Sequence, residues 1–230
     1  MITLEHVTKA YYYHGQPKYI ARDINAVFPS GKSVGLLGRN GAGKSTLLQI
    51  IAGSLNPDQG RVRVTGNISW PIGLTGCIHP ELTGVQNVKF IARIYGVDTE
   101  ELIDFVASFA ELGINYHEPV RTYSSGMRSR LNFGMSMGIR FDTYLIDEVS
   151  AVGDAGFKQK SKKVFEDRMA NSGLIIASHS DGLLKSMCTS GAVLENGQLS
   201  YFENIEDAVE VNLANMLGAG HKLALELQDE

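Results

Sequence analysis

Nine consecutive residues near the N-terminus have the types and spacing of a phosphate-binding loop. They read Gly38-Arg39-Asn40-Gly41-Ala42-Gly43-Lys44-Ser45-Thr46, which fits the pattern G-x-x-x-x-G-K-[ST]. Glycines let the backbone turn tightly enough to aim successive N–H groups into one concavity, and a following helix adds the positive end of its dipole. Lys44 would then reach the β- and γ-phosphates, and Ser45 would offer its hydroxyl to Mg²⁺. The stretch predicts a nucleotide site.

The flanking segments support this prediction. Residues 33–37 form a short apolar run after the turn signal Pro29-Ser30-Gly31, which predicts a buried parallel strand. Residues 44–52 carry leucines and isoleucines at helical spacing and are followed by Gly53, which predicts a helix. A glycine-rich surface loop, the alternative interpretation, requires neither flank. Strand, loop and helix together are the arrangement that a phosphate site needs.

Ionisable side chains follow two further apolar runs. Asp147 and Glu148 come directly after the run at residues 143–146, and His179 ends the run that starts at residue 174. Ligand chemistry in open α/β sheets gathers at the carboxyl ends of strands, so both runs deliver polar groups to such an edge. Taken singly, these residues have ordinary interpretations, because an Asp-Glu pair often caps a helix and a lone core histidine is often structural.

An aromatic triplet precedes the loop. One of Tyr11, Tyr12 and Tyr13 could stack on an adenine ring, and we favour Tyr11 for that role. The other interpretation is a tyrosine-rich strand edge, because tyrosine is also common in strands. The sequence leaves the choice within the triplet open.

The rest of the pattern predicts one α/β domain with a helical insertion. Ile2, Leu4 and His6 alternate with polar residues, as do residues 24–28, so we expect two half-buried strands at the start of the chain. Further along, the apolar period becomes helical after a capping box at residues 83–86. The expected organisation is a single domain over residues 1–230, with a core of about 1–75 and 140–230 and a helical subdomain of about 76–139.

Composition limits the classes of partner. The 230 residues are 43% apolar and carry a net charge of −4 with a pI of about 5.9, which argues against a protein held mainly by nucleic-acid phosphates or by an anionic membrane surface. The two cysteines have no metal or redox spacing, so we expect reduced thiols in the cytosol. We expect neither a membrane span nor a signal peptide.

The order of these motifs along the chain carries a family resemblance. The phosphate loop, the segment Tyr123-Ser124-Ser125-Gly126-Met127, the pair Asp147-Glu148 and then His179 resemble the ATP-binding cassette of ABC transporters, over essentially the whole chain. The resemblance implies a P-loop NTPase (RecA-like) α/β core with an N-terminal antiparallel β-subdomain and an inserted α-helical subdomain. It also implies an ATP hydrolase that uses ATP and Mg²⁺ and works as a homodimer.

The resemblance assigns a role to each matching residue. Asp147 matches the aspartate that holds Mg²⁺ together with Ser45, and Glu148 matches the base that polarises the attacking water. His179 matches the switch histidine that contacts the γ-phosphate, and Asp154 matches the acidic residue in the loop that crosses the dimer interface. Phosphoryl transfer mostly needs a charge clamp and an oriented nucleophile, which such a set would supply.

Two segments depart from the family pattern. The signature L-S-G-G-Q appears as Tyr-Ser-Ser-Gly-Met at residues 123–127, so it keeps the serine and the fourth-position glycine. Ser124, Ser125 and Gly126 of one subunit are expected to contact the ATP held by the other subunit. The Q-loop glutamine is missing near residues 73–74, which puts in doubt the usual account of how a membrane partner senses nucleotide.

Residues 68–74, 81–84 and 123–131 look like the ATP-binding subunits of bacterial capsular-polysaccharide exporters. This implies integral membrane permease subunits as partners, no nucleic acid, and a peripheral place on the cytoplasmic face of the inner membrane. Exporters of O-antigen or teichoic acid are the alternative; they often carry an appended sugar-binding domain, which we do not expect after Phe202. A soluble non-transport ABC ATPase is a further alternative, which the acidic balance disfavours.

Overall fold

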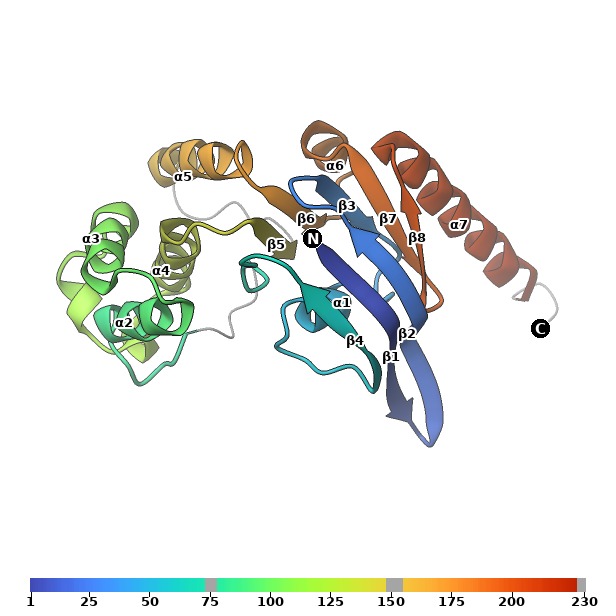
Figure 1. The fold of residues 1–230 in the computed structure, drawn as a ribbon, viewed down its shortest axis with the longest axis horizontal. Coiled ribbons are helices and arrows are strands. Elements are labelled where there is room, and N and C mark those ends of the chain that lie inside the picture. Colours follow the sequence, from blue (N-terminus) through green and yellow to red (C-terminus); the bar gives the residue numbers. More distant parts are fainter. Residues whose placement is uncertain (73–77, 148–154, 227–230) are drawn as a thin grey trace. The chain divides into compact units, whose positions relative to one another are not determined.

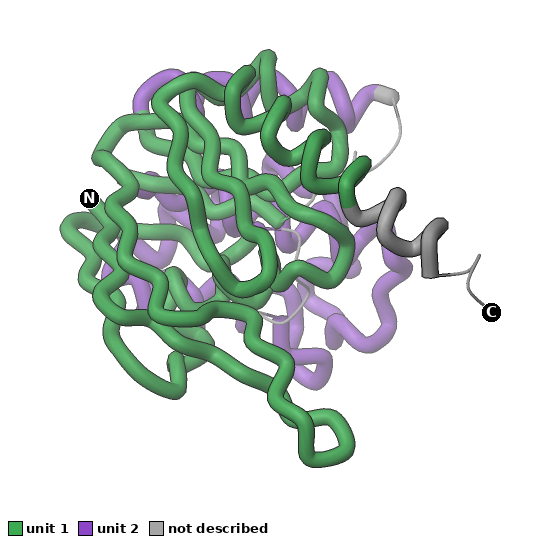
Figure 2. Tube along the Cα trace, turned by 90° about the vertical axis from the view of Figure 1, so that its right-hand side faces the viewer, with its two compact units in different colours: residues 1–71, 142–149, 172–230 green, residues 72–141, 150–171 purple. Residues whose placement is uncertain are grey.

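The computed structural model describes residues 1–72, 78–147 and 155–226. Its elements, labelled in Figure 1, are β1 (Ile2–Tyr13), β2 (Gln16–Phe28), β3 (Ser33–Leu37), α1 (Lys44–Ile51), β4 (Gln59–Val64), α2 (Gly84–Tyr95), α3 (Thr99–Ala110), the 3₁₀ turns η2 (Gly113–His117) and η3 (Val120–Thr122), α4 (Ser125–Gly138), β5 (Thr143–Asp147), α5 (Ala155–Met169), β6 (Gly173–Ala177), α6 (Asp181–Met187), β7 (Ser190–Glu195), β8 (Gln198–Phe202) and α7 (Ile205–Glu226). They form two compact units, shown in different colours in Figure 2: unit 1 comprises residues 1–71, 142–149 and 172–230, and unit 2 comprises residues 72–141 and 150–171.

Unit 1 contains two sheets. The first is antiparallel, with the strand order β2-β1-β4. The second has the order β5-β6-β3-β7-β8; its first four strands are parallel, and β8 is antiparallel to β7. The central strands read as continuous apolar runs because both faces of a parallel sheet are covered. The α/β fold with an N-terminal antiparallel sheet agrees with the predicted class.

The parallel sheet is covered on both faces. On one face, apolar side chains of α1 such as Leu47 and Leu48 form one buried cluster with Leu36 of β3 and with residues of β1 and β2. On the other face, Ile205 of α7 lies against β3 at Gly35, where Leu184 of α6 also packs. This layering fixes β3, and with it the start of the phosphate loop.

The set of β1 side chains that point into the core differs from the prediction. Ile2 and Leu4 are buried as expected, but His6 is exposed and Val7 takes the next inward position, with 0% of its surface accessible. The reason is a β-bulge: between Leu4 and Val7 the register against β2 shifts by one residue. The second predicted alternation is confirmed, since Ile24 and Phe28 of β2 are buried.

Unit 2 contains the helices α2 to α5. The predicted capping box is confirmed: the N–H of Gln86 donates to Oγ1 of Thr83, and the N–H of Thr83 donates to the Gln86 side chain. The aromatic ring of Phe109 on α3 packs against Phe133 of α4 at 5.8 Å and Phe157 of α5 at 5.2 Å between centroids. These contacts group α5 with the helices, whereas the sequence places residues 140–230 in the core. The domain limits stay a prediction.

None of the helices in the described part of the chain combines the length and the apolar character that a membrane crossing requires.

A buried serine ties residues 67–70 to the edge of the parallel sheet. Ile68 forms a parallel bridge with Thr143, and the N–H of Ser69 donates to the Thr143 carbonyl at 3.1 Å. The Ser69 hydroxyl then accepts the N–H of Leu145 at 2.8 Å and donates to the Trp70 carbonyl at 2.8 Å. The Ser69 hydroxyl thus accepts a hydrogen bond that a neighbouring strand's carbonyl would otherwise accept. Its donor, Leu145 of β5, lies two residues before Asp147.

Replacing Ser69 by alanine is expected to lower the free energy of unfolding by about 1–3 kcal/mol, because the buried N–H of Leu145 loses its acceptor. Ser54 offers a matched control, since its hydroxyl makes a single exposed bond to the Gln49 carbonyl. Ser54→Ala should change the free energy by no more than ~0.5 kcal/mol. Urea unfolding of both variants measures the difference, and equal losses would contradict the role assigned to Ser69.

Candidate nucleotide-binding site

The phosphate loop follows the carboxyl end of β3 and leaves no room for side chains at two of its glycines. Gly38 has φ +146°, and a Cβ there would lie 2.4 Å from the Leu194 carbonyl oxygen. Gly43 has φ +107°, and a Cβ there would lie 2.1 Å from a methyl group of Ile20. Only glycine tolerates both the positive φ and the close approach. The loop is therefore a backbone cradle, which fits the triphosphate of a nucleotide.

The side chain of Lys44 is hydrogen-bonded to the backbone of the phosphate loop. Its side chain is largely buried, and Nζ donates to the carbonyls of Gly38 at 2.7 Å and Arg39 at 3.1 Å. These carbonyls lie at the opposite end of the loop from Lys44 itself, so the ammonium spans the concavity. A cation in that position is placed to bind phosphate oxygens.

The N-terminus of α1 adds backbone donors. Gly43 is the N-cap and has no side chain to cap the helix, so the first N–H groups of α1 receive no side-chain hydrogen bond from their cap. Ser45, in the first turn, is exposed, and Thr46 is half-buried. Arg39, Asn40 and Gly41 are exposed on the loop, and Ala42 is half-buried. The helix dipole therefore favours an anion at this end.

Asp147 and His179 lie at the same edge of the parallel sheet as the loop. Asp147 ends β5 and pairs with Ala177 of β6, which in turn pairs with Leu36 of β3, two residues before Gly38. His179 follows β6 by two residues and is exposed, whereas Asp147 is half-buried. The strand register therefore places Asp147, His179 and the phosphate loop at one edge of the sheet, as predicted. Asp147 and Ser45 carry oxygen atoms of the kind that Mg²⁺ prefers as ligands.

Tyr11 lies near the far end of the β1–β2 hairpin, which projects from the rest of unit 1 (Figure 2). It pairs with Lys18 across the two strands, so their side chains share a face. Lys18 Nζ comes within 4.0 Å of the Cβ position at Gly41, which places this face on the side of the phosphate loop. Sequence reasoning missed Lys18, because an isolated lysine in an exposed strand gives no signal.

The signature segment forms the start of α4 in unit 2. Ser124 is the N-cap, and its hydroxyl accepts the N–H of Met127 at 3.2 Å; Ser124, Ser125 and Gly126 are all exposed. Behind them Tyr123 is buried, which raises the pKa of its phenol, and its hydroxyl donates to the Asn115 carbonyl at 2.6 Å. The turn is thus anchored on its inner side and open to a partner on its outer side.

Three predicted positions lie outside the described residues. Glu148 follows Asp147 directly, and Asp154 belongs to the segment before α5. The place of the missing Q-loop glutamine, near residues 73–74, also falls in an undescribed segment. The described residues of unit 1 therefore place the phosphate loop, Asp147 and His179 at one edge of the sheet, and the assignments of Glu148 and Asp154 rest on the sequence.

Comparison with known proteins places this site in a family. The family model described as ABC transporter matches residues 21–151. The chain is 47% identical over 213 residues to the polysialic acid transport ATP-binding protein KpsT of Escherichia coli, covering 91% of this chain and 95% of that protein. It is 44% identical over 211 residues to the capsule polysaccharide export ATP-binding protein CtrD of Neisseria meningitidis serogroup B, covering 91% and 97%.

A solved structure shares the fold. The dimeric structure of a post-hydrolysis state of the ATP-binding cassette MJ0796, bound to ADP and Pi, superposes with a TM-score of 0.72 at 19% sequence identity and covers 89% of this chain and 99% of that one. The family model, the identity to the two curated relatives and the shared fold agree with one another. The chain belongs to the ABC transporter family.

Proposed function

We propose that the chain is the ATP-binding and ATP-hydrolysing subunit of an ABC exporter for capsular polysaccharide. The observation that carries the ATPase assignment is the phosphate cradle, in which Gly38 and Gly43 exclude side chains and Lys44 Nζ spans the concavity. The assignment of the cargo is supported by the names of the relatives, which describe polysialic acid transport and capsule polysaccharide export.

The chemistry follows from the positions of the groups. The loop N–H groups and Lys44 hold the β- and γ-phosphates of ATP, so the negative charge of the transferred phosphoryl group meets fixed donors. Ser45 and Asp147 would hold Mg²⁺, which neutralises charge on the phosphate oxygens when it is bound. Glu148, next after Asp147 in the chain, accepts a proton from the attacking water, and His179 donates a hydrogen bond to the γ-phosphate.

The second half of each site comes from a second copy of the chain. Ser124, Ser125 and Gly126 are exposed at the start of α4, and a homodimer would present them to the ATP bound by the partner subunit. Asp154 would lie at the same interface. Closure of the dimer on ATP and its release after hydrolysis would drive permease subunits, which hold the protein at the cytoplasmic face of the inner membrane.

Disrupting the gene is expected to leave capsular polysaccharide inside the bacterium, because the exporter loses its motor. A plasmid copy of the wild-type chain should restore polysaccharide at the cell surface, and a Lys44→Ala copy, made to the same protein level, should not. Surface and total polysaccharide are measured with an antibody before and after permeabilising the cells. Normal surface capsule in the disrupted strain would refute the assignment of the cargo.

A further inference from the structure

The β1–β2 pair has three register shifts, and at two of them β-bulges face each other. The third, between Lys9 and Ala10, adds one residue to β2 and leaves the alternation of β1 unchanged. Between Leu4 and Val7, β1 has one residue more than the facing part of β2; between Ala21 and Ile24, β2 has one residue more than the facing part of β1. His6 and Asp23 lie in these extra segments and have φ values of +53° and +52°. Left-handed backbone is uncommon for residues other than glycine, so both conformations need support from their surroundings.

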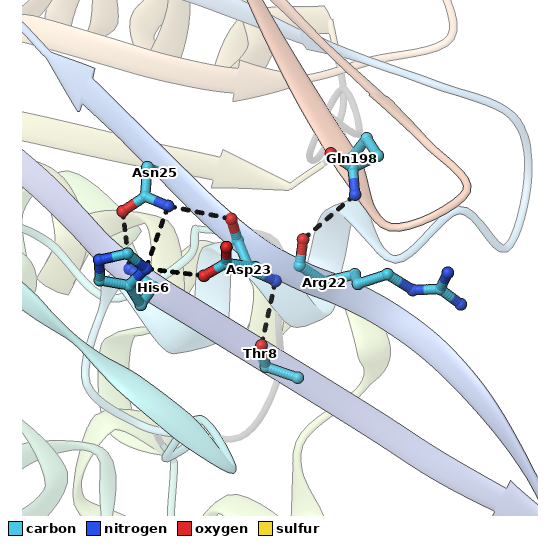
Figure 3. Close-up of polar contacts among 6 residues, drawn as sticks. All are labelled: His6, Thr8, Arg22, Asp23, Asn25 and Gln198. Atoms are coloured by element: carbon cyan, nitrogen blue, oxygen red, sulfur yellow. Dashed lines mark hydrogen bonds and ion pairs between the residues drawn. The ribbon is translucent and has the colours of Figure 1, made fainter.

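The support comes from side chains around the two residues (Figure 3). The N–H of His6 donates to Oδ1 of Asn25 at 2.9 Å, and the N–H of Asp23 donates to Oγ1 of Thr8 at 3.0 Å. Nδ1 of His6 lies 2.8 Å from Oδ1 of Asp23, and Nδ2 of Asn25 donates to the Asp23 carbonyl at 3.1 Å. The N–H groups of His6 and Asp23 and the Asp23 carbonyl are therefore satisfied within this cluster.

The β7–β8 turn holds the bulge of β2 from the other side. The N–H of Arg22 donates to the Gly197 carbonyl at 2.8 Å, and Nε2 of Gln198 donates to the Arg22 carbonyl at 3.3 Å. Because β7 also lies beside the phosphate loop, with the Leu194 carbonyl against Gly38, the bulge is fixed to the same framework as the site.

The bulge of β1 decides which side chains beyond it face inward. Side chains of a strand alternate with a period of two, so one extra residue moves every later side chain to the opposite face. Leu4 and Val7 are three residues apart, and both are buried. Counting on by twos from Val7 reaches Tyr11, whereas counting on by twos from Leu4 without a bulge would reach Tyr12.

Tyr11 is on the face that the nucleotide needs. Its strand partner Lys18 reaches the phosphate loop at Gly41, whereas Tyr12 pairs with Pro17 and faces the opposite side. The exposed fractions agree, since Tyr11 is 39% accessible and Tyr12 is 73% accessible. Without the bulge, the side chain of Tyr12 would take the place of Tyr11 on the side of the loop.

We infer that the paired bulges at His6 and Asp23 form a positioning device that selects Tyr11, and not Tyr12, for stacking on the nucleotide base. His6 acts through Tyr11 and does not itself touch the ligand. The inference rests on the proposed nucleotide function, and it concerns only the affinity for the base, not the cradle that binds the phosphates.

Two substitutions at His6 separate the backbone conformation from the side chain. His6→Val places a β-branched residue where φ is positive and should lower ATP affinity roughly 5- to 150-fold, the range for loss of a stacked base. His6→Gly keeps the left-handed conformation and should bind ATP nearly as well as the wild type. Affinity for inorganic tripolyphosphate, which has no base, should be the same in both variants. Isothermal titration calorimetry measures all of these affinities.

A second background tests whether the effect passes through Tyr11. Once Tyr11→Ala has removed the ring, adding His6→Val should cause no further loss of ATP affinity. Glu111→Val provides a matched control, because the φ of Glu111 is +52°, within one degree of that of His6, but Glu111 caps α3 in unit 2. It should leave ATP affinity unchanged. If His6→Val does not fold, Asn25→Ala tests the same bulge. It removes the acceptor of the His6 N–H and introduces no β-branched residue at positive φ.

Three outcomes would overturn the inference. The first is wild-type ATP affinity in both His6→Val and Asn25→Ala. The second is a loss in His6→Val that persists undiminished when Tyr11 is already alanine, or that appears equally for tripolyphosphate. The third is unchanged ATP affinity in Tyr11→Ala alone. In that last case a loss of binding in Lys44→Ala would still uphold the nucleotide site, so failure of the inference and failure of the proposed function are distinguishable.

Discussion

Replacing Glu148 by glutamine is expected to slow ATP hydrolysis by roughly 10²–10⁴-fold, the usual contribution of a general base, while the affinity for ATP stays near that of the wild type. The amide keeps the shape of the side chain but cannot accept the proton of the attacking water. Glu148 is the next residue in the chain after Asp147, which ends β5 at the same sheet edge as the phosphate loop. Its proposed role is to act on water, so it should not be needed to hold the phosphates. Turnover under saturating Mg-ATP measures the effect.

The same variant tests the dimer. Uncleaved ATP should hold two subunits together, because a ligand that binds the closed dimer stabilises it by mass action. Light scattering with Mg-ATP should then give the mass of two chains. Glu203→Gln, an exposed carboxylate just after β8, is the matched control and should hydrolyse ATP normally. Wild-type turnover in Glu148→Gln would falsify the assignment of the base, and an inactive variant that stays monomeric would count against a shared site.

Replacing Lys44 by alanine is expected to weaken ATP binding by about 10- to 150-fold, since hydrogen bonds to a charged group contribute about 1.5–3 kcal/mol. The loss has two physical sources. The ammonium no longer meets the phosphates, and the carbonyls of Gly38 and Arg39 lose the donor that spans the loop. Calorimetric titration with ATP measures the affinity, and urea unfolding shows that the variant is folded.

Lys32→Ala serves as the control for Lys44→Ala. Lys32 is an exposed lysine immediately before β3, so its loss changes the net charge equally without touching the loop. Its ATP affinity should match that of the wild type. Unchanged affinity in Lys44→Ala would remove the phosphate-loop assignment altogether.

Much of this site could be predicted from the sequence, because its residues belong to short contiguous motifs. The phosphate loop is a contiguous stretch, so its glycines and Lys44 appear together in one motif. Asp147 and His179 could be placed because each comes within two residues of the end of an apolar run, and parallel strands end at a common edge. The capping box at Thr83 is equally local, and the structure contains it as predicted.

Features that depend on tertiary pairing could not be read in the same way. The predicted inward orientation of His6 was wrong, because a bulge shifts the alternation of side chains in β1. The bulge is supported by hydrogen bonds to Thr8 and Asn25, and nothing in the residue pattern of the strand marks it. Lys18 was missed because its closeness to Gly41 arises only when the hairpin folds beside the loop. The grouping of α5 with the helices depends on aromatic contacts made by Phe157, which local periodicity does not report.

The position of β3 between β6 and β7 has a consequence for the growing chain on the ribosome. Within the part of the chain that the structure describes, the strand that leads into the phosphate loop pairs with residues 174–177 and 190–193, which are synthesised long after it. At about 5–20 residues per second, β3 waits roughly 7 to 30 seconds before its partner strands are made. Gly38 meets the Leu194 carbonyl only at the end of that interval. ATP can therefore bind only when the chain is nearly finished. Bound ATP stabilises the completed protein but does not stabilise a truncated product that lacks β7.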